Sequence, residues 1–118
     1  MKRLLIISLL CFSFSSLCAQ TVLVVEQGQK VSLRGLSMPT ASVVWASGSN
    51  GKVAKSVDGG NTFRWMTVEG YGKRDFRDIE AFDSSTAIIM AVDTPAIILK
   101  TTDGGKTWRK VFEDLRPG

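Results

Sequence analysis

Short apolar stretches alternate with polar, turn-forming residues along most of the chain. The stretches at 21–25, 31–38, 41–46, 52–57 and 62–68 are rich in β-branched or aromatic residues, and Gly, Pro, Asn or Ser residues bound them. This composition and spacing are typical of β-strands. None of these stretches sustains the apolar period of a helix, so the pattern predicts an all-β fold.

One eight-residue phrase occurs twice, at 56–63 and at 101–108. Both copies read Ser/Thr-x-Asp-Gly-Gly-x-Thr-aromatic, and they start 45 residues apart. The same shift places 43–67 on 88–112 without a gap. A repeat of this length with strand-like flanks indicates a propeller or a solenoid.

Upstream of the phrase the shift falls to 43, which places 32–36 on 75–79. We expect the difference of two residues to lie in the connection that holds Pro39 in one unit and 83–85 in the other, because loops tolerate insertions. The shift of 43 also places 22–26 on 65–69, which makes the start of the chain a partial third copy.

The predicted architecture is a β-propeller fragment of two four-stranded antiparallel blades plus one N-terminal closing strand. We assign the closing strand and its turn to 20–30, the blades to 31–70 and 71–114, and the start of a missing third blade to 115–118. Propellers usually have 4–8 blades, and each blade buries its apolar faces against its neighbours. We therefore expect a piece of a longer propeller, completed by further blades. The alternative is a short protein that closes a ring by self-association.

Residues 1–19 have the features of a cleaved signal peptide. Lys2 and Arg3 precede an apolar run at 4–14, and small residues precede the expected cleavage site after Ala19. The apolar run is too short for a transmembrane helix, which needs about 20 residues. We expect a secreted or periplasmic protein without a stable membrane span; lipidation at Cys18 and a retained anchor are the alternatives.

Removal of the signal peptide changes what the composition implies. The chain has a formal charge of +4, of which Lys2 and Arg3 supply two units, and both cysteines lie before Ala19. The remaining basic residues are scattered among acids, so no nucleic-acid partner is expected. No histidine is present, and no dinucleotide fingerprint occurs. We expect neither a metal nor a cofactor.

The repeated phrase combines residues that shape a hairpin turn. Asp58 and Asp103 can fold back onto turn amides, the glycines allow positive φ, and the threonine hydroxyls can donate to the turn. The aromatic residue is expected to bury its ring. The alternative for the two aspartates is a metal or acid–base role. The expected structural set is Ser56, Asp58, Gly59, Gly60, Thr62, Phe63, Thr101, Asp103, Gly104, Gly105, Thr107 and Trp108.

This phrase resembles the Asp-box, or bacterial neuraminidase repeat. The wider pattern, 98–108 with 76–83 before it, is most similar to the photosystem II assembly factor-like group of propellers. The resemblance implies a non-catalytic propeller that binds a protein or glycan partner. Because sialidases share the motif, the alternative is a sialidase-like or other glycosyl hydrolase whose active site needs blades absent from this chain. We nominate no catalytic residue, since no pair of carboxylates can be assigned.

Arg34 and Arg77 are the candidate ligand-binding residues. Each is expected in the first strand of its blade, where it could hold a carboxylate or phosphate near the central channel. The alternative is a structural arginine that pairs with Asp78, Glu80 or backbone carbonyls. Other expectations are packing roles for Trp45, Trp65 and Met90, and a solvated loop at Lys73 and Arg74.

Overall fold

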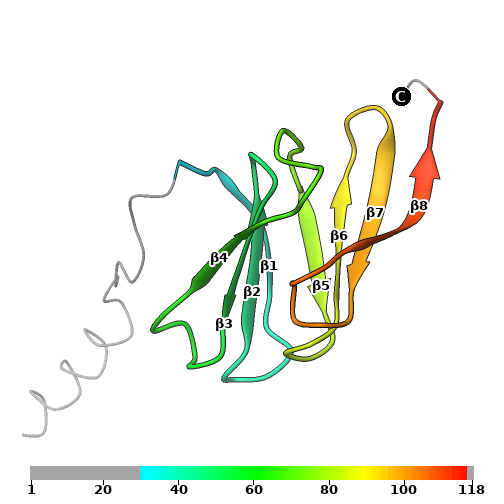
Figure 1. Cartoon of the computed structure of the whole chain (residues 1–118). Helices are drawn as coiled ribbons and strands as arrows, with labels where there is room; N and C mark the ends of the chain where they lie inside the picture. The colour runs from blue at the N-terminus through cyan, green and yellow to red at the C-terminus, as the bar shows by residue number, and fades with distance from the viewer. Residues whose placement is uncertain (1–29, 117–118) are drawn as a thin grey trace, which may run out of the picture.

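A computed structural model describes residues 30–116 and contains two four-stranded antiparallel sheets (Figure 1). The predicted all-β fold class is confirmed. The predicted signal peptide at 1–19 lies outside the described residues, and so does the predicted closing strand and turn at 20–30 except for residue 30. The strands are β1 (Leu33–Ser37), β2 (Val44–Gly48), β3 (Lys52–Ser56), β4 (Arg64–Thr67), β5 (Asp78–Ala81), β6 (Ala87–Ala91), β7 (Ala96–Thr101) and β8 (Arg109–Asp114).

Strands follow one another in space in the same order as in the chain. The first sheet has the order β1-β2-β3-β4, called blade 1, and the second has the order β5-β6-β7-β8, called blade 2. The two blades lie side by side with β1 next to β5, whereas β4 and β8 form outer edges (Figure 1). This is the arrangement of neighbouring propeller blades, whose first strands are innermost. No helix among residues 30–116 is long and apolar enough to cross a membrane.

The hydrophobic core fills the space between the blades. Trp45 of blade 1 is fully buried against blade 2, whose Ile89 and Leu99 are buried on the opposing side. Alternate residues of β6 and β7 are buried, as a strand with one covered face requires. Full burial of one such aliphatic side chain contributes about 1.5–3 kcal/mol. The blades therefore depend on each other for stability.

The strand register corrects the predicted offset between the blades. Trp45 pairs with Ser37, and Ile88 pairs with Glu80, so the first two strands of each blade are related by a shift of 43. Lys55 pairs with Arg64 and Lys100 with Arg109, which relates the last two strands by 45. The two extra residues consequently lie in the β6–β7 hairpin, within 92–96, and not in the connection with Pro39 and 83–85.

A slip of two residues explains why the gapless alignment was wrong. Side chains alternate between the faces of a strand, so a two-residue shift preserves every inward and outward position. The alignment placed Trp45 on Met90, whereas the pairing makes Trp45 equivalent to Ile88. Both residues lie on the same face of β6.

We name the faces of each blade by these pairings. The front face of blade 1 carries Trp45, Val53, Lys55, Arg64 and Met66, and it contacts blade 2. The equivalent front face of blade 2 carries Ile88, Met90, Ile98, Lys100 and Arg109. The back face of blade 2, with Ile79, Ile89 and Leu99, packs on blade 1.

Candidate functional site

The two Asp-boxes form almost identical hydrogen-bonded turns. In the second, at 101–108, the Asp103 carboxylate accepts from the Thr107 amide at 2.9 Å and the Thr107 hydroxyl at 2.5 Å. The Thr101 hydroxyl donates to Asp103 at 2.8 Å and accepts from the Gly105 amide at 2.9 Å. Asp58 makes the same contacts with Ser56 and Thr62 in the first Asp-box.

These donors stabilise the ionised aspartates. Hydrogen bonds from the Thr62 hydroxyl and amide, with a further one from Ser56, lower the pKa of Asp58 to about 2. The Thr107 hydroxyl and amide lower the pKa of Asp103 in the same way. Because both carboxylates hold their own turns and stay ionised at neutral pH, this geometry favours a capping role over proton transfer. No group of His, Cys, Asp and Glu between residues 30 and 116 could hold a metal ion.

Only the second Asp-box contacts a neighbouring blade within the described residues. Gly59 and Gly104 have φ of 74° and 79°, and Gly60 and Gly105 both have φ of 93°, which favours glycine. A Cβ on Gly104 would lie 2.8 Å from Lys55 Nζ, and one on Gly105 would lie 2.9 Å from Met66 Sδ. The second turn is therefore seated on the front face of blade 1.

Lys55 and Arg64 attach the two blades through main-chain oxygens. Lys55 Nζ donates to the Ser84 carbonyl at 3.0 Å and lies 5.1 Å from the centre of the Trp45 ring. Arg64 donates to the Gly104 carbonyl at 3.5 Å. Burial, followed by the nearby Arg64 charge, lowers the pKa of Lys55.

Aromatic contacts complete this junction. Trp108 of the second Asp-box packs edge-on against Trp45, with ring centres 6.3 Å apart. The Trp45 indole donates to the Asp83 carbonyl at 3.1 Å. Phe63, the equivalent of Trp108, lies outside the core cluster. The register places both rings on the back faces of their blades, but only the back face of blade 2 is covered by another blade within residues 30–116.

Arg34 and Arg77 both lie at the inner strands. Arg34 is in β1, and its Nε donates to Asp75 at 3.3 Å; the side chains are 42% and 33% exposed. Arg77 lies just before β5, not within it, and is exposed. It forms no ion pair with residues 30–116. The predicted partners Asp78 and Glu80 were wrong for Arg34, and Asp78 instead accepts from the Ile79 amide at 2.9 Å.

Arg74 has a structural role that the sequence analysis missed. Its guanidinium binds the Asp93 carboxylate at 3.0 Å and the carbonyls of Asp93 and Pro95 at 2.8 and 2.6 Å. The side chain is only 16% exposed, so the predicted solvated loop is wrong at Arg74. Asp93 and Pro95 belong to the hairpin with the two extra residues. The only signal in the sequence for this role was the two-residue insertion in the hairpin, and the gapless alignment concealed it.

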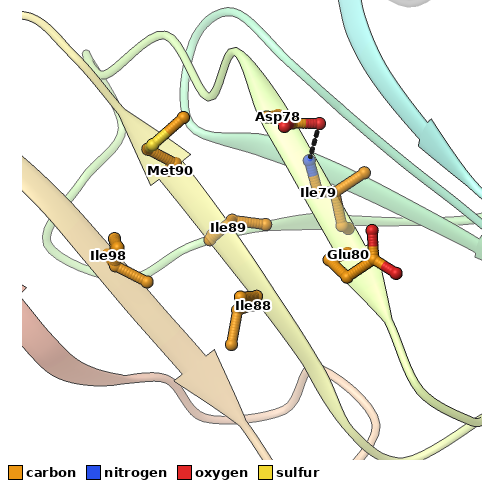
Figure 2. A pocket seen from close by; sticks show the side chains of 7 residues that line it. All are labelled: Asp78, Ile79, Glu80, Ile88, Ile89, Met90 and Ile98. Carbon is orange, nitrogen blue, oxygen red and sulfur yellow. Dashed lines mark hydrogen bonds between the residues drawn. The ribbon is translucent and has the colours of Figure 1, made fainter.

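Blade 2 carries a shallow apolar hollow at its inner strands (Figure 2). Its volume is about 90 Å³, and its floor is formed mainly by Ile88, Met90 and Ile98 on the front face. The carboxylates of Asp78 and Glu80 lie along the β5 side of the hollow (Figure 2). This hollow could not be predicted from the sequence, because its residues come from three strands and the alignment had misplaced the middle one, β6, by two residues.

The family model for photosystem II assembly factors matches this repeat architecture. The model, described as "Photosynthesis system II assembly factor YCF48", matches residues 36–118, which is more than half of the chain. The chain belongs to the YCF48 family. The predicted resemblance to photosystem II assembly factor-like propellers is thereby confirmed.

Two solved YCF48 structures have a similar fold. YCF48 from Cyanidioschyzon merolae has 24% sequence identity and a TM-score of 0.58, with 75% of this chain and 29% of that chain covered. YCF48 bound to D1 peptide has 25% identity and a TM-score of 0.64, with 79% and 31% covered. This chain thus spans less than a third of either structure. No curated protein matches the sequence.

Proposed function

We propose that the chain supplies two blades of a non-catalytic propeller that binds a segment of a partner protein. The observation that carries this proposal is the similarity to YCF48 bound to D1 peptide, with a TM-score of 0.64 over 79% of this chain. Peptide binding is a property of that protein. Family membership and the shared blade geometry support extending it to this chain.

Arg34 and Arg77 are the residues we propose for the contact. Arginine pairs well with carboxylates because its planar fork can donate two parallel hydrogen bonds. Arg77 has no ion pair with the described residues, and the Arg34–Asp75 pair is exposed, so it contributes little to stability and can be exchanged for a ligand. The chemistry favours an acidic segment, or a free C-terminal carboxylate, of a partner protein.

Fluorescence anisotropy with a labelled acidic peptide tests this proposal. Arg77→Ala should weaken binding by about tenfold or more, because a hydrogen bond to a charged group contributes about 1.5–3 kcal/mol. Lys110→Ala is the matched control, because it removes one positive charge from the outer strand β8. Equal affinities for the wild type and the Arg77 variant would contradict the assignment of Arg77 to the site.

The site of action is proposed to lie outside the cytoplasm. The positive residues and apolar run at 1–14, with cleavage expected after Ala19, support export. Mass spectrometry of protein produced in an export-competent bacterial host should find Gln20 as the first residue. A mature chain that keeps residues 1–19 would contradict the cleavage.

No observation favours the sialidase-like alternative or a glycan partner. A glycosidase needs two carboxylates at a set separation across the scissile bond. Asp58 and Asp103 hold their own turns, and Asp75 and Asp93 bind Arg34 and Arg74. We therefore propose only the protein-binding function.

A further inference from the structure

The junction between blades 1 and 2 includes, beside its hydrophobic core, a polar clasp in which Lys55 and Arg64 of blade 1 bind main-chain oxygens at and near the second Asp-box. Lys55 Nζ lies between the Gly104 position and the Ser84 carbonyl, which accepts its hydrogen bond at 3.0 Å. Arg64 binds the Gly104 carbonyl from the same face. Nearer the inner strand, Ile79 of β5 is buried against blade 1 with 2% exposure.

The front face of blade 2 repeats the basic half of this clasp. Pairing places Lys100 where blade 1 has Lys55, and Arg109 where blade 1 has Arg64. Neither side chain forms an ion pair with the described residues. Lys100 and Arg109 thus stand side by side on β7 and β8, on the face turned away from blade 1.

The first Asp-box repeats the accepting half of the clasp. The space between Gly59 and Ala41, here called the cradle, is open. Ala41 is the equivalent of Ser84 by the shift of 43 that relates the first halves of the blades. A Cβ on Gly59 would lie 3.5 Å from the Ala41 carbonyl oxygen and would meet no other described atom within 4 Å. At Gly104 the corresponding space holds Lys55 Nζ. The cradle formed by Gly59 and Ala41 therefore has room for a lysine.

The apolar parts of the two faces also correspond. Leu36 of β1 is the equivalent of the buried Ile79, yet it is 67% exposed. The hollow on blade 2 lies at the inner strands of the opposite face and has an apolar floor of Ile88, Met90 and Ile98 (Figure 2). Leu36 on the back face of blade 1 and the hollow on the front face of blade 2 both lie at the inner strands. They would therefore face each other if these two faces met.

We propose that the front face of blade 2 binds the back face of blade 1 of a second copy of this chain. Lys100 then donates to the Ala41 carbonyl and Arg109 to the Gly59 carbonyl of the other copy, while Leu36 enters the hollow on blade 2. The contact is heterologous, so it adds copies head to tail and forms a ring where the rotation closes.

The inner end of this contact differs from the junction within the chain. A Cβ on Gly35 would lie 2.9 Å from the Ile79 amide nitrogen, so glycine there allows the inner strands to approach closely. Blade 2 has Asp78 at that register position and Glu80 in place of Ser37. The copies are therefore more widely separated at the inner strands, which leaves the space that Leu36 fills.

Sedimentation velocity of the whole chain over a range of concentrations tests the proposal. The wild type should form species larger than a monomer. Leu36→Asp, and separately the double variant Lys100→Glu/Arg109→Glu, should weaken association by roughly tenfold or more, as expected for lost charged hydrogen bonds or a buried charge. Lys73→Glu, which reverses one exposed charge in the β4–β5 loop, should associate like the wild type. Circular dichroism confirms that each variant keeps its strands.

A mixture of the two variants distinguishes head-to-tail association from other modes. The Leu36 variant keeps an intact front face, and the Lys100/Arg109 variant keeps an intact back face. An equimolar mixture should therefore form dimers and nothing larger. A wild type that stays monomeric at every concentration, a mixture that stays monomeric, or a Lys73 variant as impaired as the others would overturn the proposal.

Discussion

The equivalent residues of the two Asp-boxes differ in what surrounds them, although their own conformations agree. Both aspartates cap their turns, and the paired glycines have similar φ values. Of these four glycines, only Gly104 and Gly105 face another blade among the described residues. Local turn chemistry could thus be predicted from the phrase itself. The inter-blade role of the second phrase could not, because its contacts lie more than 35 residues away in the chain.

The matched glycines allow the inter-blade contact to be isolated. Gly60→Ala and Gly105→Ala should each lower the free energy of unfolding by about 1–2 kcal/mol, because φ is 93° at both positions. Gly105→Ala should lose about 1 kcal/mol more, since its Cβ would lie 2.9 Å from Met66 Sδ and 3.4 Å from the Trp45 ring. Urea unfolding measures both losses. Equal losses would show that the second turn is not seated on blade 1.

The lowered pKa values of the two capping aspartates predict that the protein loses stability in acid. The pKa of Asp58 is about 2 in the folded chain, against an ordinary value of 3.8, and that of Asp103 is lowered too. Their contribution is complete above pH 3.8 and is lost as the pH falls towards 2, because the unfolded chain binds protons first. Urea midpoints at pH 6 and pH 2.5 measure this loss. The urea midpoint of the double variant Asp58→Asn/Asp103→Asn should fall less between these pH values than that of the wild type. An equal fall would assign the acid sensitivity to other groups.

Elements were predicted better than their connections. The pattern predicted β1 to β4 by apolar runs and turn residues, and the fold class is confirmed by the two sheets. The alignment failed in the β6–β7 hairpin because a slip of two residues leaves the hydrophobic pattern unchanged. The same slip concealed the equivalence of Trp45 with Ile88, and Arg74 was missed because its partners belong to that hairpin.

Arg74 should hold the β6–β7 hairpin to the lead-in segment of blade 2. Arg74→Ala removes hydrogen bonds to the Asp93 carboxylate and to two carbonyls, which should cost about 2 kcal/mol of unfolding free energy. Amide hydrogen exchange should also accelerate in residues 92–96. Lys73→Ala is the control and should stay within about 0.5 kcal/mol of the wild type. Unchanged exchange in the Arg74 variant would contradict this role.

At the scale of the whole molecule, the repeat predicts the fold and the family better than it predicts which residues bind a ligand. The period of the phrase led to the propeller fold, which the two solved structures confirm. The residues of the phrase led to the photosystem II assembly factor-like group, which the family model confirms. Arg34 and Arg77 were nominated as ligand-binding residues only because each was expected in the first strand of its blade. The surroundings of Arg34 depend on Asp75, which the fold brings to it from 41 residues away in the chain, and no local sequence pattern predicts such a contact.

The central functional claim is that exposed arginines at the inner strands bind carboxylates of a partner protein. Isothermal titration calorimetry with one peptide in two forms, with a free C-terminal carboxylate and with a C-terminal amide, tests it most directly. The wild type should bind the free acid more tightly, and Arg34→Ala/Arg77→Ala should remove the difference between the two forms. Equal affinity of the wild type for both forms, or an unchanged preference in the double variant, would contradict the claim.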